Sequence, residues 1–451
     1  MDTLLAAIEK INSVTNRIVW GMPILVTFLL VGLLYSVKLG FFQFSGFKCW
    51  MSNTLGRILK SRDKSGDGSS ISSYQAMSTA LAASIGTGNI VGVASGMALG
   101  GAGAVFWMWI AAVIGMMTSF AENALGMMYR QKNKNGEWVG GPMYYIEKGL
   151  NQKWLAVFFA VACMLAALGV GNMVQSNAIA GSLKVCFGVP TSVTGIIIAA
   201  LTAITIFGGI KRIASATEKL VPIMAAFYII GSLIVILANF KNIGSAFYMI
   251  FTGAFNIRSA AGGAGGYTVA LAMKYGISRG VFSNEAGLGS SPIVYAAAEK
   301  SSPEQVGMWG IFQVFIDTIV VCTLTAVCIL VSGALGTGST DGVEISTAAF
   351  ANVFGRFGTV FVSVSIVMFA FATLISWSYY GERCVEYLGD GSYIPVYKAL
   401  YVIFALFGCV INMELVWSVS DTFNGLMAIP NIIALILLSG KLSKKTMKLK
   451  K

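Results

Sequence analysis

The sequence of 451 residues contains no histidine. Histidine is the commonest metal ligand and general base, so its absence argues against a zinc or haem centre and against histidine-dependent catalysis. The seven cysteines are scattered, mostly within hydrophobic runs, and form no Cys-x-x-Cys pair. We interpret them as small buried apolar residues rather than as a disulfide framework. Since no nucleophile–base or metal constellation is found either, we predict that the protein is not an enzyme.

Charged residues are also scarce. They make up 11% of the chain, whereas a soluble domain carries about 25%. Hydrophobic residues make up 56%, and the mean hydropathy is +0.76. This composition predicts an all-α protein that crosses the membrane many times, in contact with lipid. Proline occurs only 8 times, so most of the membrane helices can be continuous.

Eleven hydrophobic runs are long enough to cross a hydrocarbon core, which needs about 20 helical residues. The runs lie near residues 18–38, 71–99, 103–129, 154–183, 190–209, 219–239, 267–297, 305–333, 357–387, 393–411 and 414–440. Basic residues concentrate between certain runs, at 38–64 and 130–153, and in the tail 441–451. By the positive-inside rule, the C-terminus is cytoplasmic and the N-terminus outside. The same rule explains the net charge of +12 without a nucleic-acid partner.

Two of these runs are interrupted at their middles by glycine and small polar residues, at 82–90 and at 282–292. Lipid cannot satisfy backbone N–H and C=O groups that have left a helix, so such groups must face protein, water or a ligand. Two broken helices in corresponding places of two halves indicate the binding site of a secondary transporter.

The positions of the broken runs predict an internal repeat. They are the second and the seventh of the eleven, so the ten runs after the first divide into two sets of five. An odd number of spans forces the two sets into opposite topologies. The predicted N-terminal domain (1–70) is a transmembrane helix followed by a cytoplasmic interfacial helix at 41–60 and a polar loop at 61–70. A first five-helix repeat (71–239), an inverted second repeat (240–440) and a basic cytoplasmic tail (441–451) are predicted to follow.

Four segments resemble motifs of the alanine or glycine:cation symporter family, within the amino acid–polyamine–organocation superfamily. The most specific is GGAGAVFWMWI at 100–110, and the others are GTGN at 86–89, GGPMYY at 140–145 and SNEAGLG at 283–289. The resemblance covers nearly the whole chain. It implies a LeuT-type core of five plus five helices, preceded by one extra helix.

The resemblance also implies cation-coupled uptake of alanine or glycine by alternating access. The protein would then be a multi-pass protein of a prokaryotic cell membrane that works as a monomer. We favour sodium as the coupling ion, because no histidine suggests a proton relay. The alternative is a proton-coupled amino acid transporter or exchanger.

The broken helices supply the predicted substrate site. The residues assigned to it are Gly86, Thr87, Gly88, Asn89, Gln175, Phe282, Ser283 and Trp377. N–H groups at Gly86, Thr87 and Gly88 are predicted to bind the substrate carboxylate, as half-helix N-termini do. Carbonyls near Phe282 and Ser283 should face the ammonium group. Alternatively, the glycines serve close helix packing.

Three of these side chains have a second interpretation each. Asn89 either coordinates a ligand or caps the half-helix that follows it. Gln175 either bonds the substrate or links helices, and we favour the pocket. Trp377 either walls a pocket with room only for glycine or alanine, together with Phe282, or packs in the bundle.

The sodium site is assigned by similarity to the LeuT-type architecture. Carbonyls of Ala82 and Ile85 would meet hydroxyls of Thr373 and Ser376, which share a helix face because they are three residues apart. Such oxygen ligands suit a hard cation. Alternatively, the hydroxyls bond to their own helix. The adjacent hydroxyl pair usual in relatives is not evident here, which leaves the ligand set open.

Four acidic residues fall within predicted spans, where a charge is costly and therefore marks a functional candidate. They are Glu122, Glu285, Asp317 and Asp421. Glu285 lies inside the second break, and we favour a structural role for it, with Arg279 or Lys274 as possible partners. Compensation of the cation and proton acceptance are its alternatives.

Overall fold

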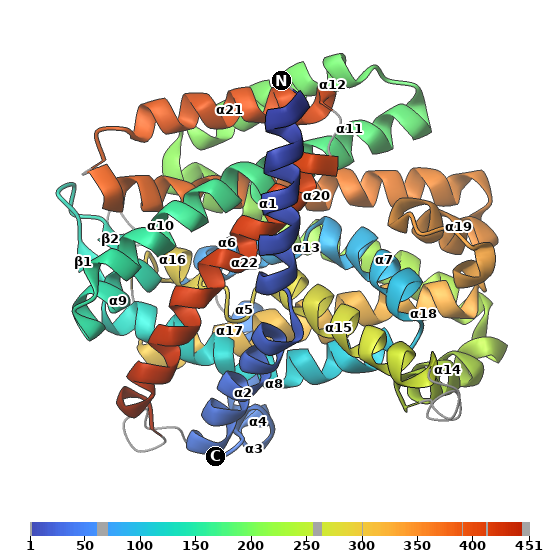
Figure 1. The fold of residues 1–451 in the computed structure, drawn as a ribbon, viewed down its shortest axis with the longest axis horizontal. Helices are drawn as coiled ribbons and strands as arrows, with labels where there is room; N and C mark the ends of the chain where they lie inside the picture. Colours follow the sequence, from blue (N-terminus) through green and yellow to red (C-terminus); the bar gives the residue numbers. More distant parts are fainter. Residues whose placement is uncertain are drawn as a thin grey trace.

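The computed structural model describes residues 2–60, 71–255, 264–299, 301–389, 391–411 and 414–443, and nearly all of them are helical (Figure 1). The helices of the first part are α1 (Asp2–Val19), α2 (Met22–Lys38), α3 (Phe42–Ser45), α4 (Phe47–Asn53), α5 (Leu55–Lys60), α6 (Ser73–Ser84), α7 (Val91–Gly100), α8 (Ala104–Met128), α9 (Pro142–Leu150), α10 (Lys153–Leu168), α11 (Val174–Phe187), α12 (Thr191–Ile206) and α13 (Gly209–Ala238).

The second part of the chain is also built of helices that follow one another along the sequence. Its helices are α14 (Ile243–Phe255), α15 (Ala264–Asn284), α16 (Ser291–Tyr295), α17 (Pro303–Val314), α18 (Thr323–Val331), α19 (Gly342–Phe354), α20 (Arg356–Gly389), α21 (Ile394–Val410) and α22 (Glu414–Leu437). Two π-helical segments join neighbouring helices without a turn: η2 (Gly169–Met173) links α10 to α11, and η5 (Phe315–Cys322) links α17 to α18. Such π segments are rare and are found frequently at functional sites.

Among the described residues, seven helical segments are long and apolar enough to cross a membrane. They are Glu9–Lys38, Ala104–Met128, Lys153–Phe187, Gly209–Ala238, Pro303–Val331, Arg356–Gly389 and Val416–Lys441. Three shorter apolar helices, α7, α12 and α21, coincide with further predicted runs. The predicted helical, multi-pass architecture is confirmed, and the total of eleven spans stays a prediction.

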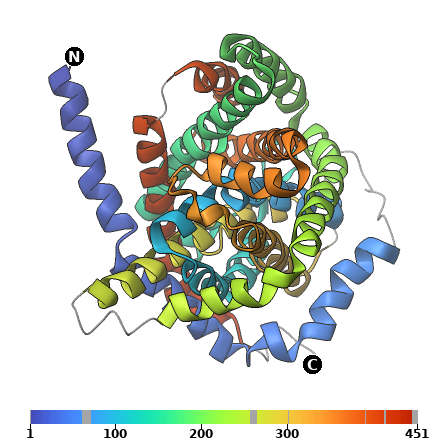
Figure 2. The ribbon, with the colours of Figure 1, turned by 90° about the vertical axis from the view of Figure 1, so that its right-hand side faces the viewer.

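The N-terminal part and one connection depart from the prediction. The interfacial helix expected at 41–60 is wrong in detail, because the chain leaves helical geometry at Gly46 and Thr54 and forms α3, α4 and α5. The loop predicted at 61–70 lies outside the described residues. Helix α1 was not predicted, and Figure 2 shows it at the edge of the bundle. A two-stranded antiparallel hairpin, β1 (Gln131–Lys132) with β2 (Trp138–Val139), also interrupts the expected all-α fold.

Both predicted breaks are present. A capping box between Ser72 and Gln75 starts α6, and this helix ends at Ser84. The chain then extends through Gly86 (φ −131°, ψ −153°) and forms the short 3-10 helix η1 (Thr87–Asn89) before α7 begins.

The second break lies between α15 and α16. Three residues of this turn have positive φ: Glu285 (60°), Gly287 (90°) and Gly289 (82°). Glycine adopts this geometry freely, whereas a glutamate there is uncommon, so its surroundings must hold it in place.

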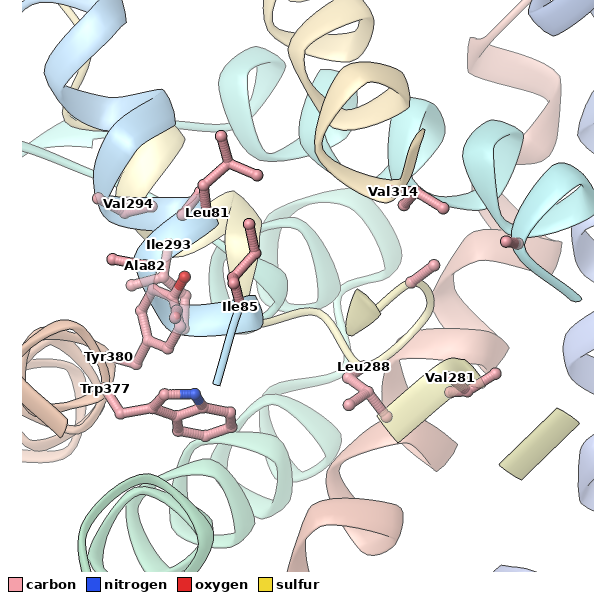
Figure 3. Packing of buried hydrophobic residues seen from close by; sticks show 14 of the residues in the cluster. Leu81, Ala82, Ile85, Val281, Leu288, Ile293, Val294, Val314, Trp377 and Tyr380 are labelled. Atoms are coloured by element: carbon pink, nitrogen blue, oxygen red, sulfur yellow. The ribbon is translucent and has the colours of Figure 1, made fainter. Parts of the chain in front are cut away.

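The broken helices lie in the interior of the bundle. Helix α8 packs along both α15 and α17, and α20 packs against α6, α10 and α11. In Figure 3 the indole of Trp377, on α20, lies next to the point where the chain leaves α6 at Ile85. The packing therefore brings the first break, the second break and α20 to one buried region.

Candidate functional site

The first break is shaped by a close approach to α20. A Cβ atom added at Gly86 would lie 2.6 Å from the Thr373 hydroxyl, whereas one at Gly88 would meet Phe282 and Ser283 at an ordinary 3.6 Å. The N–H of Gly86 donates to Asn89 Oδ1 at 2.9 Å. The Asn89 side chain therefore bonds back to the start of η1, and the predicted cap of the half-helix that follows is not formed, because no described side chain caps α7. Gly86 contributes space for the α20 hydroxyl rather than a free N–H group.

Three polar atoms near this break are buried and have no hydrogen-bond partner within the described structure: Thr87 Oγ1, Gln175 Oε1 and Ser376 Oγ. Buried polar atoms are nearly always satisfied, so each exception needs an explanation, such as a ligand or water. Gln175 Oε1 lies 3.6 Å from the Cβ position of Gly86, while its Nε2 donates to Val170 O in η2 at 3.0 Å. The predicted pocket residue Gln175 thus meets the first break.

Trp377 is oriented by the second break. Its Nε1 donates to Glu285 Oε1 at 3.0 Å, and the side chain is only 1% exposed. On its other side it packs so closely on Gly171 that a Cβ there would lie 2.4 Å from Trp377 Cβ. Trp377 therefore packs in the bundle and also lies beside the end of α6 (Figure 3).

The predicted sodium ligands are brought together in part. Thr373 Oγ1 donates to Ala82 O, near the C-terminal end of α6, at 3.0 Å. The alternative that this hydroxyl bonds to its own helix is therefore wrong for Thr373. Ser376 lies one turn further along α20 and is fully buried, and Ile85 caps α6. Whether these four residues bind sodium stays a prediction.

A polar cluster that the sequence did not reveal joins the two breaks. Asp317, in η5, accepts hydrogen bonds from Asn89 Nδ2 at 2.7 Å and from Ser283 Oγ at 2.9 Å. Asn89 belongs to the first break and Ser283 to the end of α15. No spacing in the sequence links these residues, because 228 and 34 positions separate them from Asp317.

Two further buried carboxylates, Glu122 and Glu285, hold the second turn. Glu285 accepts from Trp377 and from the Ser290 hydroxyl, so the expected pairing with Arg279 or Lys274 is not formed. Glu122, on α8, accepts from Gly287 N at 3.3 Å and from Asn431 Nδ2 at 2.9 Å. These bonds explain how a glutamate with positive φ is maintained at 285.

Comparison with known proteins identifies the family and the fold of the chain. The sodium:alanine symporter family matches residues 5–451. The sodium/alanine symporter AgcS of Methanococcus maripaludis is 43% identical over 451 residues, which cover 97% of this chain and 96% of the relative. The probable sodium/glutamine symporter GlnT of Bacillus subtilis is 39% identical over 433 residues, covering 96% of this chain and 88% of GlnT.

Among solved structures, that of MhsT in complex with L-phenylalanine superimposes with a TM-score of 0.63. The match covers 85% of this chain and 92% of MhsT at 13% sequence identity. A likeness at this identity concerns the fold alone, which is of the LeuT type.

Proposed function

The chain belongs to the sodium:alanine symporter family, and we propose that it imports alanine or glycine together with sodium by alternating access. It is a multi-pass secondary transporter of amino acids and not an enzyme. The relative AgcS is named a sodium/alanine symporter, and this supports alanine and sodium as the substrates that the present chain transports. We place the N-terminus outside and the basic tail in the cytoplasm, because that orientation follows the positive-inside rule.

The observation that carries the substrate assignment is the set of unpartnered polar atoms at the first break. The first N–H groups of a helical segment have no partner within it, so Thr87 and Gly88 at the start of η1 suit a carboxylate. The unpartnered Gln175 amide oxygen suits the ammonium group. Phe282 borders Gly88, and Trp377 lies beside the end of α6, so both can limit the substrate side chain.

For the coupling ion we propose a site between α6 and α20. The contact between Ala82 O and Thr373 Oγ1 supports it, and the unpartnered Ser376 hydroxyl offers a further oxygen. Carbonyl and hydroxyl oxygens are the ligands that hard cations prefer. A cation there would join the broken helix to α20, and this link gives the ion a way to influence closure of the site.

We also propose the division into repeats at 71–239 and 240–440, with the protein working as a monomer. The order of elements supports the repeat. Each half has a broken helix near its start, preceded in the second half by α14, and a long helical segment follows the break, α8 in one half and α17–η5–α18 in the other. These two segments pack against each other along α8 and α17.

Uptake of radiolabelled alanine into proteoliposomes tests the function. We expect accumulation with an inward sodium gradient and none with an equal potassium gradient. Uptake that follows a proton gradient instead would favour the proton-coupled alternative. Uptake of other amino acids with no response to alanine or glycine would contradict the substrate assignment.

A further inference from the structure

We propose that the three short helices α3, α4 and α5 bind anionic phospholipids of the cytoplasmic leaflet. We call this segment, residues 42–60, the arm; it lies at the edge of the bundle (Figure 2). The inference goes beyond the transport of alanine or glycine. It rests on the proposed function only for the orientation of the chain, which places the arm on the cytoplasmic side.

The first argument is that the arm carries charge of one sign only. Residues 42–60 contain Lys48, Arg57 and Lys60 and no acidic residue. The side chains of Lys48 and Arg57 are exposed, and within the described part of the chain neither forms a hydrogen bond or an ion pair. A basic side chain near the cytoplasmic leaflet is attracted by its anionic lipids. Both side chains are therefore available to an anionic headgroup.

The other polar connection on this side has a different character. The hairpin β1–β2 and α9 carry acidic as well as basic residues. Glu137 pairs with Arg383 at 3.0 Å, and Glu147 lies 4.0 Å from Lys153. The positive-inside rule applies to both connections, so it does not by itself explain why the arm lacks acidic residues.

The second argument is the apolar surface beside these cations. Phe41, Phe44, Phe47 and Leu55 are all exposed. The three helices have 4, 7 and 6 residues, whereas a helix that crosses the hydrocarbon core needs about 20. These side chains therefore do not belong to a membrane-spanning helix. Exposed aromatic side chains beside basic ones are typical of segments that lie in the membrane interface.

The two features together select the occupant. A soluble phosphate ion would neutralise the cations but leave the phenylalanine rings in water. A second copy of this chain, with its net charge of +12, would bring more positive charge to the arm. An anionic phospholipid meets both requirements, because its phosphate faces Lys48 and Arg57 while its acyl chains cover the rings.

Two buried rings connect the arm to the helices of the transport core. Phe42 packs edge-to-face on Phe120 of α8, with 6.0 Å between ring centroids, and Trp50 packs in the same way on Phe315 of η5, at 5.6 Å. Trp50 Nε1 also donates to Gln43 O at 3.1 Å and so holds α3 and α4 together. Helix α8 follows the first break and η5 follows the second. Lipid that fixes the arm therefore acts on both segments.

Lipid binding to the purified full-length protein tests the proposal. The protein in detergent is titrated with phosphatidylglycerol or with phosphatidylcholine of the same acyl chains, and bound lipid is counted by native mass spectrometry. We expect the wild type to prefer phosphatidylglycerol. The double variant Lys48→Gln/Arg57→Gln should bind it about 25-fold more weakly, since each cation near an anionic surface accounts for about fivefold, the fold-change of about 1 kcal/mol.

The matched control is Lys241→Gln/Arg356→Gln. It removes the same two residue types, both of them exposed, from the side that the proposed orientation places outside. This variant should bind phosphatidylglycerol as the wild type does. All the substituted side chains are exposed, so thermal stability should stay at the wild-type value in both variants.

Four results would overturn the proposal. The first is equal affinity of Lys48→Gln/Arg57→Gln and the wild type for phosphatidylglycerol. The second is an equal loss in the control variant, which would make the effect one of net charge. The third is a wild type that does not distinguish phosphatidylglycerol from phosphatidylcholine. The fourth is a change in the number of chains per particle in the arm variant, which would identify a second copy as the occupant.

Alanine uptake separates the arm from the transport function. In proteoliposomes with a sodium gradient, wild-type uptake should rise with the fraction of phosphatidylglycerol, and in Lys48→Gln/Arg57→Gln this dependence should be lost. A variant that keeps the dependence of the wild type would contradict the arm alone. A wild type that prefers phosphatidylglycerol but takes up neither alanine nor glycine would contradict the proposed function and support the arm.

Discussion

Replacement of Gly86 by alanine is the sharpest test of how the first break serves the coupling ion. The added Cβ would lie 2.6 Å from Thr373 Oγ1 and 3.5 Å from Thr373 Cβ. Since real Cβ atoms essentially never come so close, the Thr373 hydroxyl must move. That hydroxyl donates to Ala82 O at 3.0 Å, so the change moves one proposed sodium ligand and breaks its contact with a second.

The expected magnitude follows from these contacts. Loss of the hydrogen bond costs about 0.5–1.5 kcal/mol, and overpacking of a filled interior adds about 1–3 kcal/mol. The lower ends of these two ranges, about 0.5 and about 1 kcal/mol, add up to about 1.5 kcal/mol. If this whole cost falls on sodium binding, the affinity for sodium decreases roughly tenfold, because 1.4 kcal/mol is a factor of ten. We therefore expect the half-saturating sodium concentration of Gly86→Ala to rise at least about tenfold.

Gly88→Ala is the matched control in the same break. Its Cβ would make ordinary contacts of 3.6 Å with Phe282 and Ser283, so the sodium ligands should keep their places. The measurement is alanine uptake into proteoliposomes over a series of sodium concentrations, with thermal stability of each variant recorded. A normal half-saturating sodium concentration in Gly86→Ala, or an equal rise of that concentration in Gly88→Ala, would refute the reasoning, whereas a lower maximal uptake in Gly88→Ala would concern its proposed contact with the substrate carboxylate.

Three further predictions concern other parts of the site and the fold. Gln175→Ala should weaken alanine binding by about tenfold, as expected for a lost charge-assisted hydrogen bond, and leave sodium binding without alanine unchanged; an equal loss of sodium binding would make the effect structural. Trp377→Phe removes the N–H that bonds Glu285, so alanine uptake should fall and larger amino acids should compete better in uptake assays; unchanged selectivity would remove Trp377 from the pocket. Arg383→Ala removes a buried guanidinium that pairs with Glu137, Glu382 and Glu386. Because Lys398 still pairs with Glu382, the loss should be near the lower end for a broken buried pair, about 3 kcal/mol, measured by thermal unfolding, whereas exposed Arg356→Ala should not destabilise the protein.

The sequence was sufficient for the features that depend on neighbouring residues. Long apolar runs must become helices in lipid, so their approximate limits follow from hydropathy alone. The breaks at 82–90 and 282–292 follow from glycine and small polar residues within such runs, and the structure breaks both helices there. The GGAGAVFWMWI segment was enough to identify the family, which the comparison over residues 5–451 bears out.

Some local detail was missed for the same physical reason. Helix α1 and the hairpin β1–β2 have no long apolar run, so hydropathy carried no signal for them. The expected partner of Glu285 was chosen for its charge and its nearness in sequence. The turn instead directs the Glu285 carboxylate towards Trp377 and Ser290, and these two uncharged side chains donate hydrogen bonds to it.

The tertiary structure alone decided which side chains meet. Resemblance pointed to Ala82 and Thr373 as partners, but their contact across 291 positions exists only because α20 crosses the end of α6. The meeting of Asn89 and Ser283 on Asp317 had no signal in the sequence at all. Hydropathy and glycine content are properties of short stretches of sequence, so the helices and breaks that depend on them can be predicted from the sequence. A buried polar contact depends on how distant helices pack, which no local pattern specifies.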